Sequence, residues 1–507
     1  MLQRIIVWMV FMTLSLSGLG QELLYSDPLR EDNVEINFEI LGKVGGNYII
    51  YKGNGNRHYL QVLDKDMQQI SNNRLKFLDD RLLNVDFVVY PDYFFMIYQR
   101  QKNSVVQCNA LRFNSRGEKV GDIFTIDTTK IGLLANSRIY STTYSEDKKK
   151  ILVYKMRYKD DEVTLVTKRM SDQLELTDSI RYNMKYNERR DVFSDLQVAN
   201  DGSIVFARQR KQGYRENIND VEIFSIAPGS QQYISKPLSL SDKYIDEVKI
   251  KIDNLNRNYL LNSFFYTSRN GNVEGLYASQ LDMSALAEKN LFIPFPDSIR
   301  RRISDGKYRS AFDDMFLRNI FLKRDGSYML VAEDYSSFTS GNNWNRWDYL
   351  YGSPYGYSGY SMYSPGYYNY YRPYRDYSRF SNNTRYEYDN MLIMDVDSSL
   401  KPKWMNIVFK SQSDDNSDNY LSYGTHNAGS EIYFLFLEKI KNRQVVSSQA
   451  LSANGSIRRN ATLKSREKGY EFMPRLSKQV GLYEVIIPAT YRGLISFVKV
   501  NFSRPSL

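Results

Sequence analysis

Two stretches of this chain repeat one turn between two β-prone runs, and this repetition constrains the fold more than any other feature. The first is Ala199-Asn200-Asp201-Gly202-Ser203, which precedes the run from Ile204 to Ala207. The second is Lys323-Arg324-Asp325-Gly326-Ser327, which precedes the run from Tyr328 to Ala332. An Asp-Gly pair between β-branched and aromatic residues indicates a hairpin, because glycine tolerates the positive φ of a tight turn. Such a recurring turn predicts a repeated supersecondary unit.

The repeated unit contains four short strands and is most complete between Phe316 and Phe409. Its runs are Phe316 to Leu322, Ser327 to Glu333, Met391 to Val396 and Trp404 to Phe409. Comparable units follow one another along the chain at a spacing of roughly 40 to 50 residues, as in propellers and other repeat arrays. No long helical periodicity interrupts them. We therefore predict an all-β chain that forms a single β-propeller domain over residues 21–507.

The last unit is incomplete, and this predicts how the ring closes. It offers three strands: Phe472 to Leu476, Leu482 to Pro488 and Leu494 to Phe502. Because proteins cover unpaired sheet edges, we expect Leu23-Leu24-Tyr25 to supply the fourth strand. The propeller then has eight four-stranded blades. Seven blades is the alternative, because the unit from Val248 to Asp305 has a looser pattern. A pair of β-sandwiches is disfavoured, because no linker divides the chain.

The first twenty residues are typical of a secretory signal peptide. Arg4 precedes an apolar run from Ile5 to Leu16, and Ser17-Gly18-Leu19-Gly20 places small residues at a cleavage site. We expect the mature chain to begin near Gln21, to be exported, and to contain no transmembrane span. Cys108 is the only cysteine, so no intrachain disulfide can form. This favours a bacterial periplasm or cell surface, and we expect Cys108 to be a small core residue.

The formal net charge of +10 bears on partners rather than on fold. For an exported chain, it favours anionic glycans or acidic protein surfaces over nucleic acid. The basic residues are scattered, and their small groups are expected at solvated turns.

The sequence contains no convincing catalytic site, and we expect neither a cofactor nor a metal. His58 and His426 are the only histidines and are expected at the surface or in turns. The segment from Asp414 to Asn419 begins like a calcium loop but lacks the glycine and glutamate that such loops need, so we favour an acidic loop. A glycan-cleaving propeller would collect carboxylates from separate blades. The candidates for that alternative are Asp195, Asp253 and Asp325.

A Tyr-, Gly- and Ser-rich insertion at 336–388, inside the sixth unit, is the strongest functional signal. Long loops in compact domains are usually functional or disordered. Tyrosine and tryptophan provide large contact areas at low entropic cost, and arginine adds bidentate hydrogen bonds. Protein binding, glycan binding and a loop without a ligand all remain open. The candidate partner-binding residues are Trp344, Arg346, Trp347, Tyr349, Tyr351, Tyr355, Tyr357, Tyr367, Tyr368, Tyr370, Tyr371, Arg372 and Tyr374.

The Tyr- and Asn-rich composition, the Gly-Leu-Gly-Gln signal end and the Asp-Gly-Ser turns resemble those of exported propeller proteins of the Bacteroidota. The turn from Ser145 to Lys150 is similar to that of translocation-associated and WD40-like propellers, although its proline and glycine are replaced. The resemblance implies a non-enzymatic interaction scaffold of the cell envelope, in the periplasm or associated with the outer membrane. Its expected partner is an envelope protein or an outer-membrane secretion or motility complex. A glycan-binding or glycan-cleaving propeller is the alternative.

Overall fold

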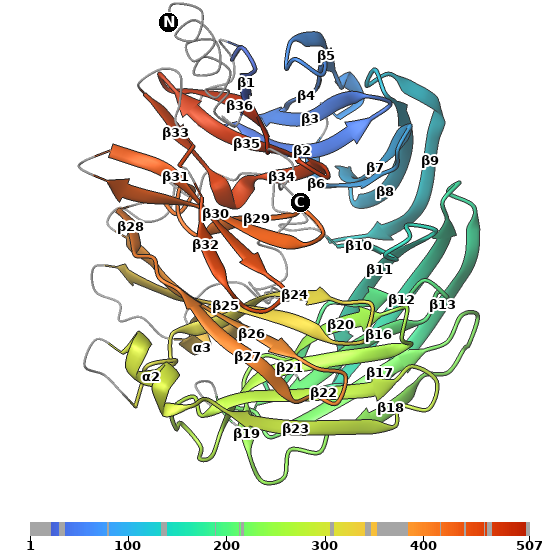
Figure 1. Cartoon of the computed structure of the whole chain (residues 1–507). Coiled ribbons are helices and arrows are strands. Elements are labelled where there is room, and N and C mark those ends of the chain that lie inside the picture. Colours follow the sequence, from blue (N-terminus) through green and yellow to red (C-terminus); the bar gives the residue numbers. More distant parts are fainter. Residues whose placement is uncertain are drawn as a thin grey trace, which may run out of the picture.

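The computed structural model describes most of the chain outside its two ends and the centre of the insertion. The described residues are 22–29, 36–78, 81–132, 139–187, 189–211, 213, 217–304, 309–339, 346–351, 384–415, 417–440, 443–460, 462–463 and 469–502. They form eight antiparallel sheets arranged as the blades of a propeller ring (Figure 1). The prediction of an all-β propeller with eight blades is confirmed.

The first four blades follow the chain without interruption. Blade 1 contains β2 (Asn37–Val44), β3 (Asn47–Asn54), β4 (Arg57–Leu63) and β5 (Gln69–Arg74), and η1 (Lys76–Leu78) leads out of it. Blade 2 contains β6 (Arg81–Val89), β7 (Tyr93–Lys102), β8 (Val105–Asn114) and β9 (Lys119–Lys130). Blade 3 contains β10 (Ser141–Tyr144), β11 (Lys150–Lys159), β12 (Glu162–Ser171) and β13 (Leu176–Lys185). Blade 4 contains β14 (Asp191–Phe193), β15 (Gln197–Val198), β16 (Ile204–Arg210), β17 (Asp220–Ile226) and β18 (Ile234–Pro237).

Among the other four blades, blades 5, 6 and 8 carry additional strands or helices, and blade 7 has four strands. Blade 5 contains β19 (Tyr244–Ile245), β20 (Lys249–Asp253), β21 (Asn258–Tyr266), β22 (Gly275–Asp282) and β23 (Glu288–Pro294), followed by α2 (Asp297–Ile303). Blade 6 contains β24 (Met315–Leu322), β25 (Tyr328–Thr339), β26 (Thr384–Val396), β27 (Pro402–Val408) and β28 (Gln412–Asp415), with α3 (Arg346–Tyr351) between β25 and β26. Blade 7 contains β29 (Tyr423–Asn427), β30 (Glu431–Ile440), β31 (Arg443–Ser452) and β32 (Ile457–Arg459). Blade 8 contains β33 (Tyr470–Phe472), η2 (Pro474–Leu476), β34 (Lys478–Gly481), β35 (Glu484–Tyr491), β36 (Leu494–Asn501) and β1 (Glu22–Tyr25).

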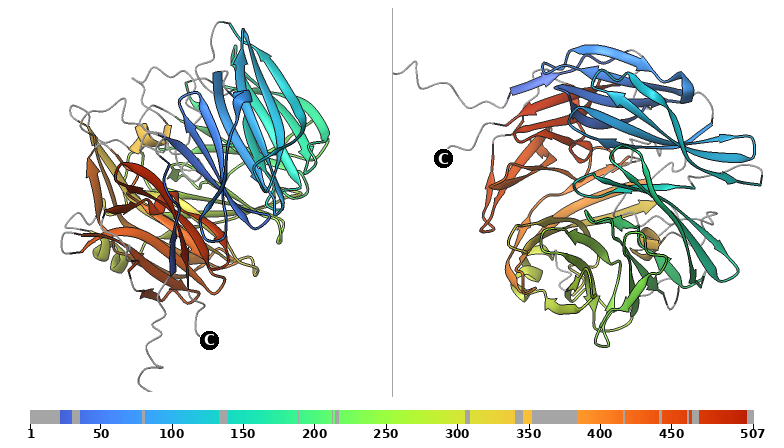
Figure 2. Two further views of the ribbon diagram at one scale, coloured as in Figure 1. Left: turned by 90° about the horizontal axis from the view of Figure 1, so that it is seen from above. Right: turned by 90° about the vertical axis from the view of Figure 1, so that its right-hand side faces the viewer.

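The N-terminal strand closes the ring, as the sequence predicts. β1 pairs antiparallel with β36, from Glu22 opposite Asn501 to Tyr25 opposite Val498. Figure 2 shows the first and last strands side by side at one edge of the molecule. The inner part of blade 8 differs from the expectation, because the predicted strand from Phe472 to Leu476 is divided. Pro474 lacks the N–H that a ladder needs and begins η2, and the chain resumes pairing as β34.

The recurring turn has the same backbone pattern in three blades. The Gly202 N–H donates to the carbonyl of Ala199, and the Gly326 N–H donates to that of Lys323. Both glycines have positive φ, at +92° and +76°. In blade 3, Lys148 occupies the equivalent position with a φ of +59°. The turn therefore survives the loss of its glycine, and the strand-turn-strand prediction is confirmed there.

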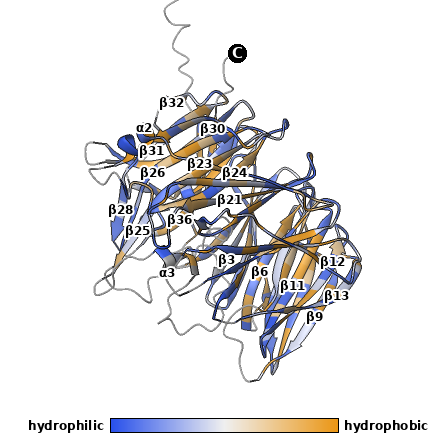
Figure 3. Ribbon diagram, turned by 90° about the horizontal axis from the view of Figure 1, so that it is seen from below, coloured by the Kyte–Doolittle hydropathy of each residue, from blue (hydrophilic) through white to orange (hydrophobic). Residues whose placement is uncertain are grey.

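Neighbouring blades are joined by apolar clusters and by a repeated side-chain contact. One such cluster combines Leu260 and Phe264 of blade 5 with Leu330 of blade 6, and Figure 3 shows apolar residues distributed along the strands of the blades. Asn73 in the fourth strand of blade 1 donates to the Arg116 carbonyl of the next blade at 2.8 Å. Tyr182 donates likewise to the Ser230 carbonyl, and Asn406 donates to the Gly455 carbonyl at 2.9 Å. Each acceptor lies in the turn between the third and fourth strands of the following blade. Within the described residues, no helix is long and apolar enough to cross a membrane.

Candidate functional site

The hairpin that carries the insertion is longer than the sequence indicates. β25 and β26 stay paired from Tyr335 opposite Tyr388 to Thr339 opposite Thr384. The expected loop boundaries at 336 and 388 therefore fall inside paired strands, because alternating Ser, Thr and aromatic residues extend the ladder. Between residues 340 and 383, the described part of the insertion is α3. Trp347 and Tyr351 lie in this helix, and Arg346 and Tyr349 are described with their side chains. The remaining candidates lie outside the described residues: Trp344, Tyr355, Tyr357, Tyr367, Tyr368, Tyr370, Tyr371, Arg372 and Tyr374.

Blade 6 has two register shifts near the point where this hairpin leaves the sheet. Leu317 and Asn319 pair with consecutive residues of β25, so Arg318 is an extra residue in β24. On β25, Asp334 is left between Glu333 and Tyr335, which pair with residues of β26 that are three apart. Bulges re-aim side chains and increase local twist. They direct Arg318 toward Glu333 and toward the base of the insertion.

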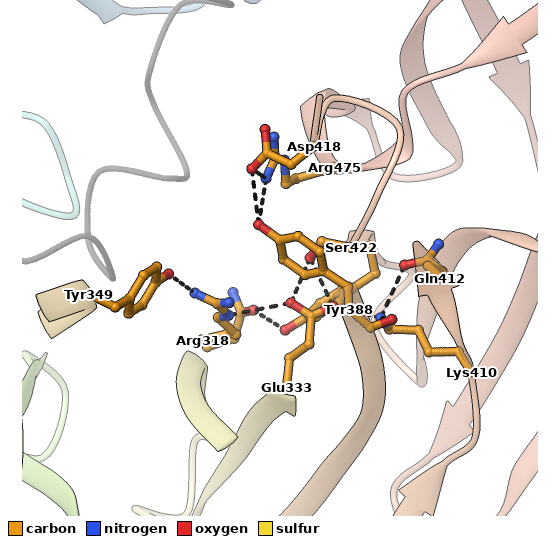
Figure 4. A network of polar contacts seen from close by, with 11 residues as sticks. Arg318, Glu333, Tyr349, Tyr388, Lys410, Gln412, Asp418, Ser422 and Arg475 are labelled. Atoms are coloured by element: carbon orange, nitrogen blue, oxygen red, sulfur yellow. Dashed lines mark hydrogen bonds and ion pairs between the residues drawn. The ribbon is translucent and has the colours of Figure 1, made fainter. Parts of the chain in front are cut away.

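Arg318 and Glu333 form the centre of a buried polar cluster, drawn in Figure 4. The Arg318 Nη1 donates to the Tyr349 hydroxyl of α3 at 2.7 Å. Its Nε lies 3.3 Å from the Glu333 Oε2. Glu333 is fully buried and also accepts from the Ser422 hydroxyl at 2.7 Å. The Lys410 ammonium, whose side chain is fully buried too, lies 2.9 Å from the Glu333 Oε1.

A second carboxylate extends this cluster to blade 8. The Arg475 Nη1, from η2, lies 2.7 Å from Asp418 Oδ2 and donates to the Tyr388 hydroxyl at 3.0 Å. The Tyr388 hydroxyl donates to the same Asp418 oxygen at 3.0 Å. Lys410 Nζ donates to the Tyr388 carbonyl at 3.0 Å and to the Gln412 side chain at 3.1 Å. The cluster thus joins blade 6, the connection to blade 7, and blade 8.

Burial and mutual attraction oppose each other in this cluster. Burial lowers the pKa of Lys410, although Glu333 partly opposes this shift. Burial alone would lower the pKa of Arg318, but Tyr349 and Glu333 reverse the effect and raise it. Burial alone would raise the pKa of Asp418, but Arg475 and Tyr388 hold it below its usual range. Each buried charge in this cluster is therefore paired with an opposite charge of the same chain, as expected for ion pairs that hold elements of the fold together.

Arg346 anchors the insertion to blades 5 and 6. Its guanidinium lies 2.6 Å from the Asp246 carboxylate and donates to the carbonyls of Asp313 and Met315 at 2.9 and 2.6 Å. Asp246 also accepts from Ser263 and Tyr266 at 2.8 and 3.1 Å. Arg346 is one of the candidate partner-binding residues, and the structure places its guanidinium in these contacts with blades 5 and 6.

Apolar contacts also attach α3 to blade 6. Leu350 is only 3% exposed and packs in the cluster that contains Phe316, Tyr335 and Tyr388. The Tyr349 ring lies 4.6 Å from that of Phe316 and 4.7 Å from that of Tyr335. The first helical turn of the insertion is therefore part of the propeller core.

The expectation of exposed histidines is wrong, because both rings are buried. The His58 ring stacks on Tyr51 and hydrogen-bonds its hydroxyl at 2.8 Å, in blade 1. The His426 ring packs against Tyr433 and Phe502. They belong to separate clusters and form no shared site. Cys108 is fully buried, which confirms its predicted role in the core.

The acidic segments take structural positions. Asp414 and Asp415 lie in β28, paired with β26, and Asp418 binds Arg475, so the expected acidic loop is largely structured. Asp253 is buried and accepts from both the backbone and the side-chain amide of Asn256. The Asp325 side chain is 62% exposed in its turn. The described residues include no group of three or more His, Cys, Asp or Glu side chains that could hold a metal ion.

The remaining candidate of the glycan-cleaving alternative is Asp195. It lies between β14 and β15, in the divided inner strand of blade 4. Asp253 instead ends the inner strand of blade 5, and Asp325 lies in a hairpin turn of blade 6. The fold thus distributes the three carboxylates over three blades, and each occupies a different local environment.

We expect His426 to make the protein sensitive to acid. Burial lowers its pKa from an ordinary value of 6.5 to about 4. The unfolded chain therefore binds a proton between these pH values while the folded chain does not, so stability falls as the pH drops below 6.5. The loss should reach about 2 kcal/mol at pH 5. The free energy of unfolding, measured with urea, should differ less between pH 7.5 and pH 5.0 for His426→Phe than for the unsubstituted chain. Equal differences would contradict the prediction.

Comparisons with known proteins place the chain in no family. No protein-family model and no curated protein match it. Prolyl oligopeptidase B from Galerina marginata has a TM-score of 0.40 at 8% identity, over 91% of this chain and 56% of that protein. Dihydro-heme d1 dehydrogenase NirN has a TM-score of 0.39 at 11% identity, and the match covers 95% of this chain and 76% of that protein. A Synechocystis apocarotenoid oxygenase variant has a TM-score of 0.36 at 9% identity, and the match covers 88% of this chain and 93% of that protein. This chain thus spans little more than half of the oligopeptidase, and the propeller assignment rests on its own sheet topology.

Proposed function

We propose that this protein is a non-enzymatic, exported β-propeller that serves as a protein-interaction scaffold in the cell envelope. Its Tyr-rich insertion is the proposed partner-binding element. The proposed location is the periplasm or the outer membrane, with an envelope protein or an outer-membrane complex as the partner. The signal-like N-terminus and the single cysteine support this location.

The observation that carries the proposal is the attachment of α3. Arg346 and Leu350 attach the first part of the insertion to blades 5 and 6 through an ion pair and an apolar contact. A binding element is most effective when its base is held by a rigid scaffold, because less conformational entropy is lost on binding. The paired charges of the polar cluster also support a structural role for the groups nearest the insertion.

The decisive experiment shortens the insertion but leaves α3 in place. We expect replacement of residues 352–383 by a short Gly-Ser linker to leave the thermal midpoint within about 2 °C, because no described core residue is removed. Affinity capture from the native envelope, with mass spectrometry, should then lose the partner that the full chain retains. A second variant keeps the length but changes Tyr367, Tyr368, Tyr370 and Tyr371 to serine.

The outcomes separate the candidate functions. Loss of one defined protein from both variants supports the scaffold. Capture of the same protein by all three chains would overturn the role of the insertion. Retention of an acidic polysaccharide without any protein would favour the glycan-binding alternative, and cleavage of that polysaccharide would favour an enzyme.

A further inference from the structure

We propose that α3 is a latch whose seating is energetically coupled to blade 8 through the buried polar cluster. Release of α3 from blade 6 would weaken the hydrogen bonds and ion pair that hold η2, and disruption of the η2 contacts would weaken the attachment of α3. The proposal concerns the folded chain alone, so it stands or falls independently of any partner.

The first link is the contact between Tyr349 and Arg318. The Tyr349 hydroxyl is the one hydrogen-bond acceptor that the described residues provide for the Arg318 guanidinium. The Arg318 side chain is 9% exposed, so water reaches it poorly. Its guanidinium is also within 6 Å of the ring centres of Phe316, Tyr335 and Tyr388. When α3 leaves, Arg318 must find a new acceptor or become hydrated.

The second link is competition for Glu333. Its carboxylate already accepts from Ser422 and lies 2.9 Å from the Lys410 ammonium. A closer approach by Arg318 would weaken these two contacts, because the carboxylate offers a limited number of acceptor positions. Lys410 in turn donates to the Tyr388 carbonyl. A change at Arg318 is therefore transmitted to Tyr388. A second, apolar connection runs through Tyr335, whose ring lies 4.7 Å from the Tyr349 ring and 4.8 Å from the Tyr388 ring.

The third link reaches the blade that closes the ring. The Tyr388 hydroxyl and Arg475 share the Asp418 Oδ2, and Arg475 belongs to η2 between β33 and β34. Figure 4 shows Tyr349 at the left of the cluster, Arg318 and Glu333 at its centre, and Asp418 and Arg475 at the top. Glu333, Tyr388 and Lys410 are buried, whereas the Arg475 and Asp418 side chains are 15% and 32% exposed. Release of a contact at the centre of the cluster therefore leaves a charged or polar group that water reaches poorly. The latch requires a second arrangement in which the cluster is opened to water, and both ends then shift the same equilibrium.

Hydrogen exchange of the full chain tests this coupling. We expect Tyr349→Phe, which removes only the hydroxyl, to accelerate amide exchange at residues 470–481 by about tenfold, as for loss of one hydrogen bond to a charged group. Tyr182→Phe is the matched control, because it also removes one tyrosine hydroxyl from a partly buried hydrogen bond, here donated to the Ser230 carbonyl in blade 4. It should leave exchange in blade 8 unchanged.

The reciprocal variant keeps the test informative if Tyr349→Phe unfolds. Arg475→Gln should accelerate exchange at residues 346–351 by a similar factor, since coupling is reciprocal. Acceleration in both directions supports the latch. The proposal is overturned when Tyr349→Phe affects only α3, β24 and β25, or when Arg475→Gln leaves α3 as protected as in the unsubstituted chain.

Discussion

Replacement of Lys410 by methionine should destabilise the propeller by about 3–5 kcal/mol, the usual cost of removing one partner from a buried ion pair. Both Lys410 and Glu333 are fully buried and their charged atoms lie 2.9 Å apart. Methionine fills a similar volume, so the loss comes from the groups that Lys410 contacts. The Glu333 charge keeps Arg318 and Ser422 as its described partners. The Tyr388 carbonyl and the Gln412 side chain lose a donor. Urea unfolding at pH 7.5 should show the effect as a lower midpoint with an unchanged slope.

Lys403→Met is the matched control for that substitution. Lys403 lies 3.6 Å from Asp325, but the two side chains are 43% and 62% exposed. An exposed pair contributes less than about 1 kcal/mol. The double variant Glu333→Gln/Lys410→Met should lose less stability than the sum of its single variants, because the second substitution removes the charge that the first leaves unpaired. Additive losses would show that the two groups do not interact.

The fold could be predicted from local signals. Each hairpin turn carries its own chemistry, as in Asp325-Gly326, and each strand carries its own apolar pattern. Ring closure was also predictable. The last unit has three strands where a blade needs four, and the N-terminal run at Leu23-Leu24-Tyr25 belongs to no other unit. The departures come from single residues. Pro474 divides an inner strand, and the bulge at Asp334 shifts the base of the insertion beyond the ends of the apolar runs.

The polar cluster could not be predicted, because its members are isolated in the sequence. Glu333 ends an apolar run and Lys410 follows one, which usually places a charge in solvent. Nothing near Arg346 indicates that its partner is Asp246, 100 residues earlier. The histidine prediction failed for a more local reason, because both residues lie in strands and their rings pack on a tyrosine of the adjacent strand, Tyr51 and Tyr433. Only the three-dimensional arrangement of the blades brings the charged groups together.

The largest effect on stability is expected from loss of the closing strand. A chain that begins at Asp27 lacks β1 and leaves the outer edge of β36 unpaired. Leu23 is 8% exposed in the core of blade 8, and the Phe497 N–H donates to the Ser26 hydroxyl at 2.9 Å. Loss of this apolar burial and of the strand ladder should cost on the order of 5 kcal/mol relative to a chain that begins at Gln21. Urea unfolding compares the two chains, and light scattering should detect association through the exposed edge.

Addition of a peptide that spans residues 21–29 distinguishes strand pairing from other effects of the truncation. The peptide should restore the lost stability and suppress association, because it can pair with β36 as an added strand. A peptide of the same composition in scrambled order is the control, since it keeps the charge but loses the register that places Leu23 in the core. If the truncated chain is as stable as the longer one, β1 does not hold the ring closed. If only the authentic peptide rescues it, the ends of the chain form one blade in solution.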